Sequence, residues 1–209
     1  MAVTLIAEGG LFVAVALAIA TLGETTAASH QVALNVASVC FMLPLGLSMA
    51  ITVRVGHAVG RRDAAGVRYA GFCGIGLALC LQVLSSSLML GIPVQLARLY
   101  THDAGVIALA AQLMALAGLF QFSDGIQVAS NGALRGLKDT RVPMLITLFA
   151  YWGVGMPVGW WLAFPHGLGA RGMWMGLIAG LSVAAVLLFA RFSRSAARAR
   201  WPGNDASST

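Results

Sequence analysis

The chain has 209 residues, of which 59% are hydrophobic and only 10% are charged, and its mean hydropathy is +0.85. A soluble domain carries about 25% charged residues, so the composition excludes a soluble domain and predicts an integral membrane protein in a lipid bilayer. The net charge of +6 does not favour a nucleic-acid partner, because the basic residues fall in short clusters between apolar runs.

The apolar runs predict six membrane-spanning helices, in chain order at 4–22, 31–54, 69–91, 104–130, 143–164 and 172–190. A spanning helix needs about 20 mostly apolar residues, and these continuous runs lack the alternation of barrel strands. We therefore predict an all-α fold, with residues 1–195 forming one six-span domain and 196–209 a polar cytoplasmic tail.

The first predicted span contains a carboxylate, Glu8, followed by two glycines. No basic segment of the kind that opens a signal peptide precedes it, and the hydrophobic helix starts almost at once. We expect an internal start, inside a longer membrane protein.

Glycine and proline interrupt several spans. Pro44 lies in the second span, and the fifth contains "YWGVGMPVGWW" (151–161), for which we expect a simple kink. The sixth span has glycines at four-residue spacing, which predicts close approach of a neighbouring helix. These glycines are Gly172, Gly176 and Gly180.

The fourth span carries Asp124, the only charged side chain between Ala104 and Leu134. Residues three or seven positions away share its helical face, and they are also polar. They are Gln121, Gln127 and Asn131, and Arg135 extends the stripe. A second polar stripe, in the second span, consists of Gln31, Asn35 and Ser38.

An ionised carboxylate at the bilayer centre costs about 2.5–3.5 kcal/mol, so Glu8 and Asp124 require an explanation. One is a structural acid kept neutral by hydrogen bonds to neighbouring amides. The other is a functional site that takes up a proton, or that binds Na⁺ with help from amide and backbone oxygens. Gly125 removes bulk beside the acid and leaves room for a helix, an ion or a substrate.

The basic residues predict the orientation in the membrane. Eleven of the thirteen lie in the second-to-third connection, the fourth-to-fifth connection and the tail. By the positive-inside rule these segments face the cytoplasm, which places both ends of the chain there. The eleven are Arg54, Arg61, Arg62, Arg68, Arg135, Lys138, Arg141, Arg191, Arg194, Arg198 and Arg200.

The histidines and cysteines give no metal or redox spacing. All four histidines lie near predicted span ends, where we expect solvation by loops; they are His30, His57, His102 and His166. The three cysteines lie within apolar runs, where we expect small core-filling side chains; they are Cys40, Cys73 and Cys80.

Three segments together resemble the multidrug and toxic compound extrusion (MATE) family, in its NorM-like branch. They are "NVASVCFMLPLGLSMAITVRVGHAVGRRD" (35–63), "DGIQVASNGALRGLKDTRVPM" (124–144) and "YWGVGMPVGWWL" (151–162). The resemblance runs from about Leu5 to Arg191 and is to the C-terminal lobe of a two-lobed, twelve-helix transporter. It implies a multidrug efflux antiporter in a bacterial inner membrane, exporting organic cations in exchange for Na⁺ or H⁺, with no other cofactor.

The resemblance also implies roles for individual residues. Acids of the family's cation site carry over onto Glu8 and Asp124, although Phe120 stands where the branch can use a tyrosine. We assign Gln127, Asn131, Asn35 and Tyr151 to the translocation path. The partner implied is an N-terminal six-helix lobe that this chain lacks.

Other functions remain to be weighed. The chain could be an inactive truncated fragment, or a lobe that pairs with a separately encoded partner or with itself. A flippase for lipid-linked sugars is not expected to show "DGIQ" with "LRGLKDT". An enzyme is not expected, because an intramembrane hydrolase would need a nucleophile and base, and a channel would need a filter motif or charged ring.

Overall fold

The protein is helical throughout the part of the chain that the structure describes. The computed structural model describes residues 2–198, with side chains described from Gly9 onward. The predicted all-α fold is confirmed, since none of these residues forms a strand. The helices are α1 (Ala2–Ala20), α2 (Glu24–Gly60), α3 (Ala64–Gly91), α4 (Pro93–Arg98), α5 (Ala104–Gly136), α6 (Arg141–Leu148), the π-helix η1 (Phe149–Gly155), α7 (Met156–Ala163) and α8 (Gly169–Arg198).

Six helical segments correspond to the six predicted spans. Five stretches among the described residues are long and apolar enough to cross a membrane, and one of these joins α6, η1 and α7. The sixth is α1, whose 19 residues extend about 28 Å at 1.5 Å per residue, close to the thickness of a hydrocarbon core. The structure also has the short helix α4. Its six residues are too few to give a recognisable hydropathy pattern, so the sequence did not predict it.

The helices extend beyond the predicted spans because their ends are set by caps, not by hydropathy. Helix α2 has 37 residues. Helix α3 begins after Asp63, whose carboxylate accepts a 2.8 Å hydrogen bond from the Gly66 amide. Asp103 likewise starts α5 by accepting hydrogen bonds from the Gly105 and Val106 amides. Aspartate is a preferred N-cap residue because its carboxylate satisfies amides that have no partner within the helix. Helix α8 continues to Arg198, and the rest of the predicted tail lies outside the described residues.

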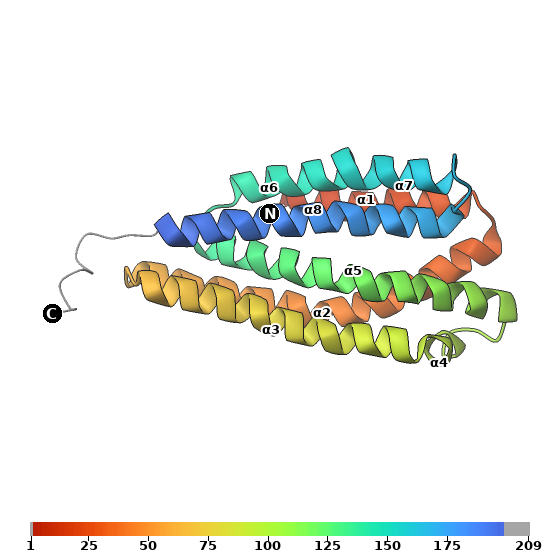
Figure 1. The fold of residues 1–209 in the computed structure, drawn as a ribbon, viewed down its shortest axis with the longest axis horizontal. Coiled ribbons are helices and arrows are strands. Elements are labelled where there is room, and N and C mark those ends of the chain that lie inside the picture. The colour runs from red at the N-terminus through yellow and green to blue at the C-terminus, as the bar shows by residue number, and fades with distance from the viewer. Residues whose placement is uncertain (1, 199–209) are drawn as a thin grey trace.

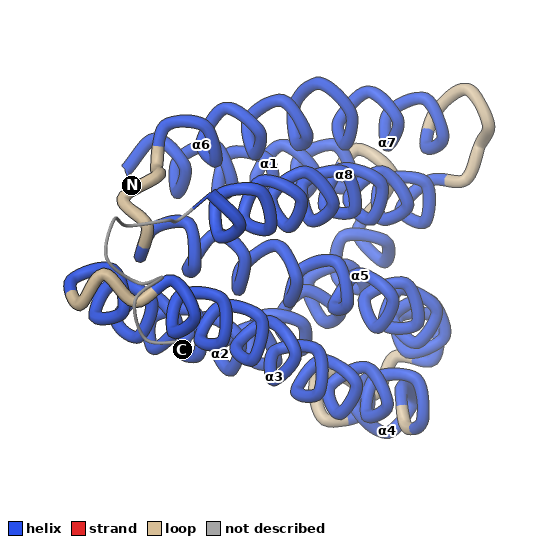
Figure 2. Tube along the Cα trace, turned by 60° about the vertical axis from the view of Figure 1, so that its left-hand side comes forward, coloured by secondary structure: helices blue, strands red, loops and turns tan. Residues whose placement is uncertain are grey.

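Helix α5 is the centre of the bundle. It contacts α2, α3 and α8 extensively, and Figures 1 and 2 show it between two groups of helices. One group contains α1, the α6–η1–α7 segment and α8, and the other contains α2 and α3. A polar residue on α5 can therefore face either group.

Two turns within the basic clusters share one backbone geometry. "GRRD" (60–63) joins α2 to α3, and "GLKD" (136–139) joins α5 to α6. In each, the third residue is left-handed, with φ of 57° at Arg62 and 62° at Lys138. The next amide, of Asp63 or Asp139, donates to a carbonyl five residues back, as in a Schellman helix end. Both turns lie at the end of the bundle where α8 also finishes (Figure 1), so the basic clusters gather at one end.

The glycines of α8 form the close helix contact that their spacing predicts. A Cβ added at Gly176 would lie 2.6 Å from the Gly155 carbonyl oxygen, and one at Gly180 2.9 Å from the Ala150 carbonyl oxygen. Gly172 meets the backbone of α7 in the same way. Helix α8 therefore packs backbone to backbone against η1 and α7, as small residues permit in membranes.

The outer surface is apolar, as lipid contact requires. Exposed side chains such as Leu17, Met42 and Val186 are each about two-thirds accessible. Two cysteines of α3, Cys73 and Cys80, are exposed on this surface, whereas Cys40 is buried as predicted. The prediction was wrong for Cys73 and Cys80, because an apolar run contains lipid-facing as well as core positions.

Candidate functional site

Asp124 lies deep inside the bundle, in the second half of the central helix α5. Only 2% of its surface is exposed. At 1.5 Å per residue it is about 30 Å from the start of α5 and about 18 Å from its end. Its predicted companions on the same face are buried as well, with Gln121 at 0% and Gln127 at 2% exposure. The predicted polar stripe is therefore an interior feature.

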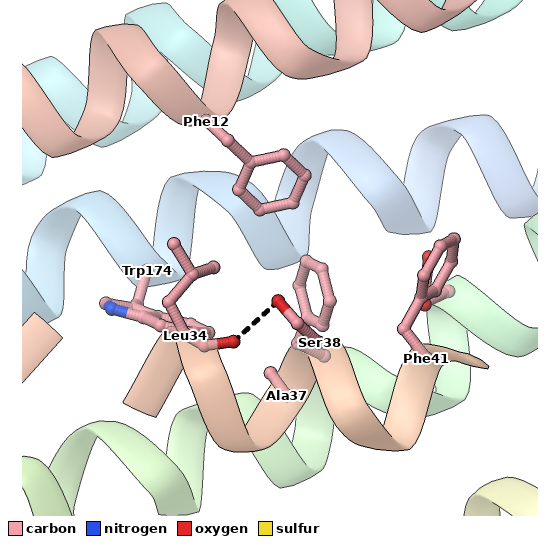
Figure 3. Close-up of a pocket in the computed structure, with 8 residues that line it drawn as sticks. Phe12, Leu34, Ala37, Ser38, Phe41 and Trp174 are labelled. Atoms are coloured by element: carbon pink, nitrogen blue, oxygen red, sulfur yellow. Dashed lines mark hydrogen bonds between the residues drawn. The ribbon is translucent and has the colours of Figure 1, made fainter. Parts of the chain in front are cut away.

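The Asp124 side chain lines a cavity of about 270 Å³ at the junction of the two helix groups. Figure 3 shows the Phe12 ring pointing from α1 toward side chains of α2, among them Ser38, whose hydroxyl donates back to the Leu34 carbonyl oxygen. The lining residues are Phe12, Leu34, Ala37, Ser38, Phe41, Phe120, Asp124 and Trp174. One acid thus faces a cavity with four aromatic walls.

The aromatic walls continue as a chain of edge-to-face contacts. The ring centroids of Phe12 and Phe120 are 6.3 Å apart, and those of Phe120 and Trp174 are 6.0 Å apart. The Trp174 Nε1–H donates a 3.2 Å hydrogen bond to His30 Nδ1. These contacts hold the Phe120 and Trp174 rings in defined orientations.

The solvation predicted for His30 is wrong. His30 is only 2% exposed, because α2 begins at Glu24, six residues earlier than His30 and well before the predicted span. Since Nδ1 accepts from the indole, the neutral imidazole carries its proton on Nε2. His30 is therefore part of the wall that supports Trp174.

The sequence predicts that Gly125 leaves room for a helix, an ion or a substrate, and in the structure the space is filled by a helix, α3. A Cβ at this position would lie 2.5 Å from Gln82 Cγ on α3. The Gln82 amide nitrogen donates to the Gln121 carbonyl oxygen at 2.8 Å and to Gln121 Oε1 at 3.0 Å. This buried amide pair fixes α3 against α5 one turn before Asp124.

The fifth span contains a π-helix where a simple kink is expected. Pro157 is at the start of α7, and it has no N–H to bond the carbonyl four residues earlier. The preceding turn widens into η1, which carries Tyr151 at 1% exposure. Trp152, next along η1, lies 3.6 Å from a Cβ built at Gly10 of α1. Such π-turns are frequent at functional sites.

The structure brings only some of the predicted site residues together. Asp124 and Gln127 are buried on one side of α5, while Asn131 is half-buried further along. Asn35 is exposed on α2, beside the cavity-lining Leu34 but outside the cavity itself. The Glu8 side chain lies outside the described residues.

Sequence reasoning missed several residues of the site. Of these, Gln82 had a usable signal, because it is the only amide in the predicted third span. The aromatic residues had none, since phenylalanine and tryptophan are common in apolar runs. They are Phe12, Phe41 and Trp174.

A cation in this cavity would meet a particular set of ligands. Among the described side chains, no three His, Cys, Asp or Glu residues gather as a metal cluster. The groups that line the cavity are the Asp124 carboxylate, the Ser38 hydroxyl and the aromatic faces, while the buried Gln127 amide lies one turn further along α5, outside the lining. Oxygen ligands suit a hard ion, whereas ring faces attract an organic cation.

The membrane-spanning helical segments define a multi-pass membrane protein with a buried carboxylate. The MatE family model matches residues 1–161. The chain belongs to the MatE family, whose members are transporters and not enzymes. The resemblance noted in the sequence is therefore confirmed.

Two relatives have names that include a function. The chain is 52% identical over 196 residues to a "Probable multidrug resistance protein NorM" of Xanthomonas campestris, covering 94% of this chain and 43% of the relative. It is 47% identical to "Multidrug resistance protein PmpM" of Pseudomonas aeruginosa, covering 94% and 42%. The chain thus spans less than half the length of these relatives.

Solved structures show the same fold. A crystal structure of MATE in the straight conformation matches with a TM-score of 0.87 at 18% identity, covering 94% of this chain and 44% of that one. The eukaryotic MATE transporter AtDTX14 matches with a TM-score of 0.76 at 24% identity, covering 83% and 40%. The six-helix bundle is one lobe of that architecture.

Proposed function

We propose that this chain is the C-terminal lobe of a multidrug efflux antiporter, with Asp124 in its coupling-cation site. The observation that carries the proposal is the burial of the Asp124 carboxylate, 2% exposed, at the wall of a partly open cavity lined by aromatic rings. Charge at that depth costs several kcal/mol unless it is neutralised. This cost favours binding of a proton or a metal cation to the carboxylate, as a coupling-cation site requires.

The coupling ion is Na⁺ or H⁺. A proton neutralises the Asp124 carboxylate directly. Na⁺ needs several oxygen ligands, and Gln127 supports this, since its buried Oε1 accepts no hydrogen bond from the described residues. Glu8 supplies a second carboxylate: it precedes the cavity-lining Phe12 by four residues, one turn of α1.

The exported substrates are small organic cations. The names of the relatives from Xanthomonas campestris and Pseudomonas aeruginosa support multidrug export. The rings of Phe12, Phe41, Phe120 and Trp174 support a positive, partly apolar substrate, because a cation over an aromatic face gains about 0.5–2 kcal/mol. We assign Gln127, Asn131, Asn35 and Tyr151 to the path that the substrate or ion follows.

Transport requires a second lobe. In transporters built from repeats, access alternates as one lobe rocks against the other around a central site. Coupling arises because the cation and the substrate favour different states, each by its differential affinity. The chain spans about 43% of its relatives, so it acts as half of such a transporter, with an N-terminal six-helix lobe as partner.

The proposed location is the bacterial inner membrane, with the arginine-rich end in the cytoplasm. Basic residues of the α2–α3 turn, the α5–α6 turn and the end of α8 share that end of the bundle. The positive-inside rule then places both ends of this chain in the cytoplasm.

The test is Asp124→Asn in a chain joined to an N-terminal lobe and reconstituted in vesicles. Cation-driven efflux of a fluorescent organic cation should be abolished while membrane insertion is unchanged. Asp139→Asn is the matched control, because Asp139 lies in a turn, where its carboxylate pairs with Arg191 at 2.8 Å. Unchanged efflux in the Asp124→Asn variant would contradict the assignment of Asp124 to the coupling-cation site.

The same vesicles identify the coupling ion. Efflux driven by a Na⁺ gradient at constant pH indicates Na⁺, and efflux driven by a pH gradient without Na⁺ indicates H⁺. If neither gradient drives export of the organic cation by the joined lobes, antiport is excluded.

A further inference from the structure

A second hollow lies far from Asp124, between α2 and α3 at the arginine-rich end of the bundle. This groove has a volume of about 470 Å³. Its lining from α2 is Leu47, Ala50, Ile51, Arg54, Ala58 and Arg61. Its lining from α3 is Gly66, Tyr69, Ala70, Cys73, Gly74 and Leu77. Most of these side chains are apolar and two are arginines.

Small residues create the groove. The lining positions on each helix recur in the i, i+3, i+4, i+7 pattern of a single helical face, so each helix contributes one face. Alanine and glycine occupy about half of these positions. Gly74 allows the closest approach, since a Cβ there would lie 2.7 Å from Ile51 Cδ1. The helices therefore touch at Ile51 and leave a channel on their outer side.

The groove is apolar at depth and positively charged toward its mouth. Arg61 is at the turn, Arg54 is seven residues further in and Leu47 another seven. At 1.5 Å per residue this side of the groove is about 21 Å long, with Arg61 at its outer end and Arg54 at its midpoint. Helix α3 is antiparallel, so the exposed Tyr69 lies toward the mouth and Leu77 lies deeper.

Both guanidinium groups are available to an anion. Arg54 forms no ion pair with any carboxylate of the described residues. Arg61 is 3.8 Å from Asp63, but both side chains are well exposed, at 67% and 38%. Such a surface pair contributes little, and the Asp63 carboxylate already caps α3. The groove therefore presents two positive charges above an apolar channel.

We propose that this groove binds an anionic phospholipid. Arg54 and Arg61 bind the phosphate, the Tyr69 hydroxyl donates a hydrogen bond to it, and an acyl chain lies along the apolar part toward Leu47 and Leu77. Basic pockets between membrane helices on the cytoplasmic side bind anionic headgroups. Arginine suits this role because its planar group can donate two hydrogen bonds to one phosphate. The site is independent of the cation site.

The charge part of the proposal is tested by titrating the purified full chain with phosphatidylglycerol or phosphatidylcholine and following bound lipid by native mass spectrometry. Each basic residue near a membrane contributes about 1 kcal/mol toward anionic lipid. The double variant Arg54→Gln/Arg61→Gln should therefore bind phosphatidylglycerol about 30-fold more weakly. The control, Arg62→Gln/Arg68→Gln, removes the same charge from exposed residues outside the groove and should lose far less.

The apolar part is tested separately. Ala50→Trp fills the groove without changing its charge, and should abolish the preference for phosphatidylglycerol. Val53→Trp, an exposed position on α2 outside the groove, should leave it intact. Glycerol phosphate, which has the anion but no acyl chain, should not compete.

Three results would overturn the proposal: equal binding of the two lipids, equal losses in the two arginine pairs, or full competition by glycerol phosphate. The last would identify a site for a free phosphate. A circular-dichroism melt of each variant establishes that the chain is folded in every comparison.

Discussion

Replacing Gly176 with alanine tests the close packing of α8 against η1 and α7. The added methyl group would lie 2.6 Å from the Gly155 carbonyl oxygen, against the 3.4 Å at which ordinary contact begins. The backbone N and Cα of Gly159 on α7 lie closer still, so the obstacle is backbone and not a flexible side chain, and α8 must move away from η1 and α7 by roughly 1 Å. Gly172 and Gly180 would lose contact at the same time, since they lie one turn away on the same face.

The cost exceeds the gain that alanine normally gives. Overpacking of a close-packed interior costs about 1–3 kcal/mol, whereas glycine to alanine within a helix stabilises by about 0.5–1 kcal/mol. We expect Gly176→Ala to lower the unfolding free energy by about 1–2 kcal/mol. For a chain of this size that lowers Tm by about 2–8 °C.

The assay is thermal unfolding in detergent, followed by circular dichroism, with a matched control. Gly76→Ala adds the same methyl group on α3, where no atom lies within 4 Å. The control should melt at or slightly above the wild-type temperature, opposite in sign to Gly176→Ala. If Gly176→Ala melts as high as Gly76→Ala, the backbone contact between α8 and η1 is not as close as described.

Three further substitutions test the local structure by the same melting assay. Trp174→Phe removes the hydrogen bond to His30 and should cost about 1–3 kcal/mol; its effect should not add to that of His30→Leu in a double-mutant cycle. Asp103→Ala removes the cap of α5 and should cost about 1 kcal/mol, whereas Asp103→Asn should cost much less. Lys138→Gly relieves a positive φ and should stabilise by up to about 1 kcal/mol; a lower Tm would contradict this.

The six spans could be predicted because the thickness of the bilayer sets the length of an apolar run. Helix ends could not be predicted in this way, since they depend on caps. The 37-residue α2 extends beyond its predicted span at both ends. The error at His30 has the same cause: a residue at the edge of an apolar run lies well inside the helix and is buried against Trp174.

The burial of Asp124 and of its polar companions on α5 could be predicted from the sequence, since the polar residues share one helical face in a long apolar run. The walls around it could not be predicted. Phe12 and Trp174 are far apart in sequence, and their rings meet at Phe120 only because α1, α5 and α8 pack in one register. Sequence periodicity shows which residues share a face of one helix, but it does not show which faces of different helices pack against each other.

Asp124 and Gly125 face different sides of α5, and in the proposed cation site this determines how a cation would reach the acid. Gly125 is in contact with Gln82, so the side of α5 toward α3 is closed by a buried amide pair. Asp124 instead lines the cavity between α1, α2 and α8. A cation must therefore approach the carboxylate from between these three helices, past the aromatic rings. Any movement of α1 or α2 relative to α5 changes the width of this path. The arrangement of the helices and the binding of a cation to Asp124 would therefore depend on each other.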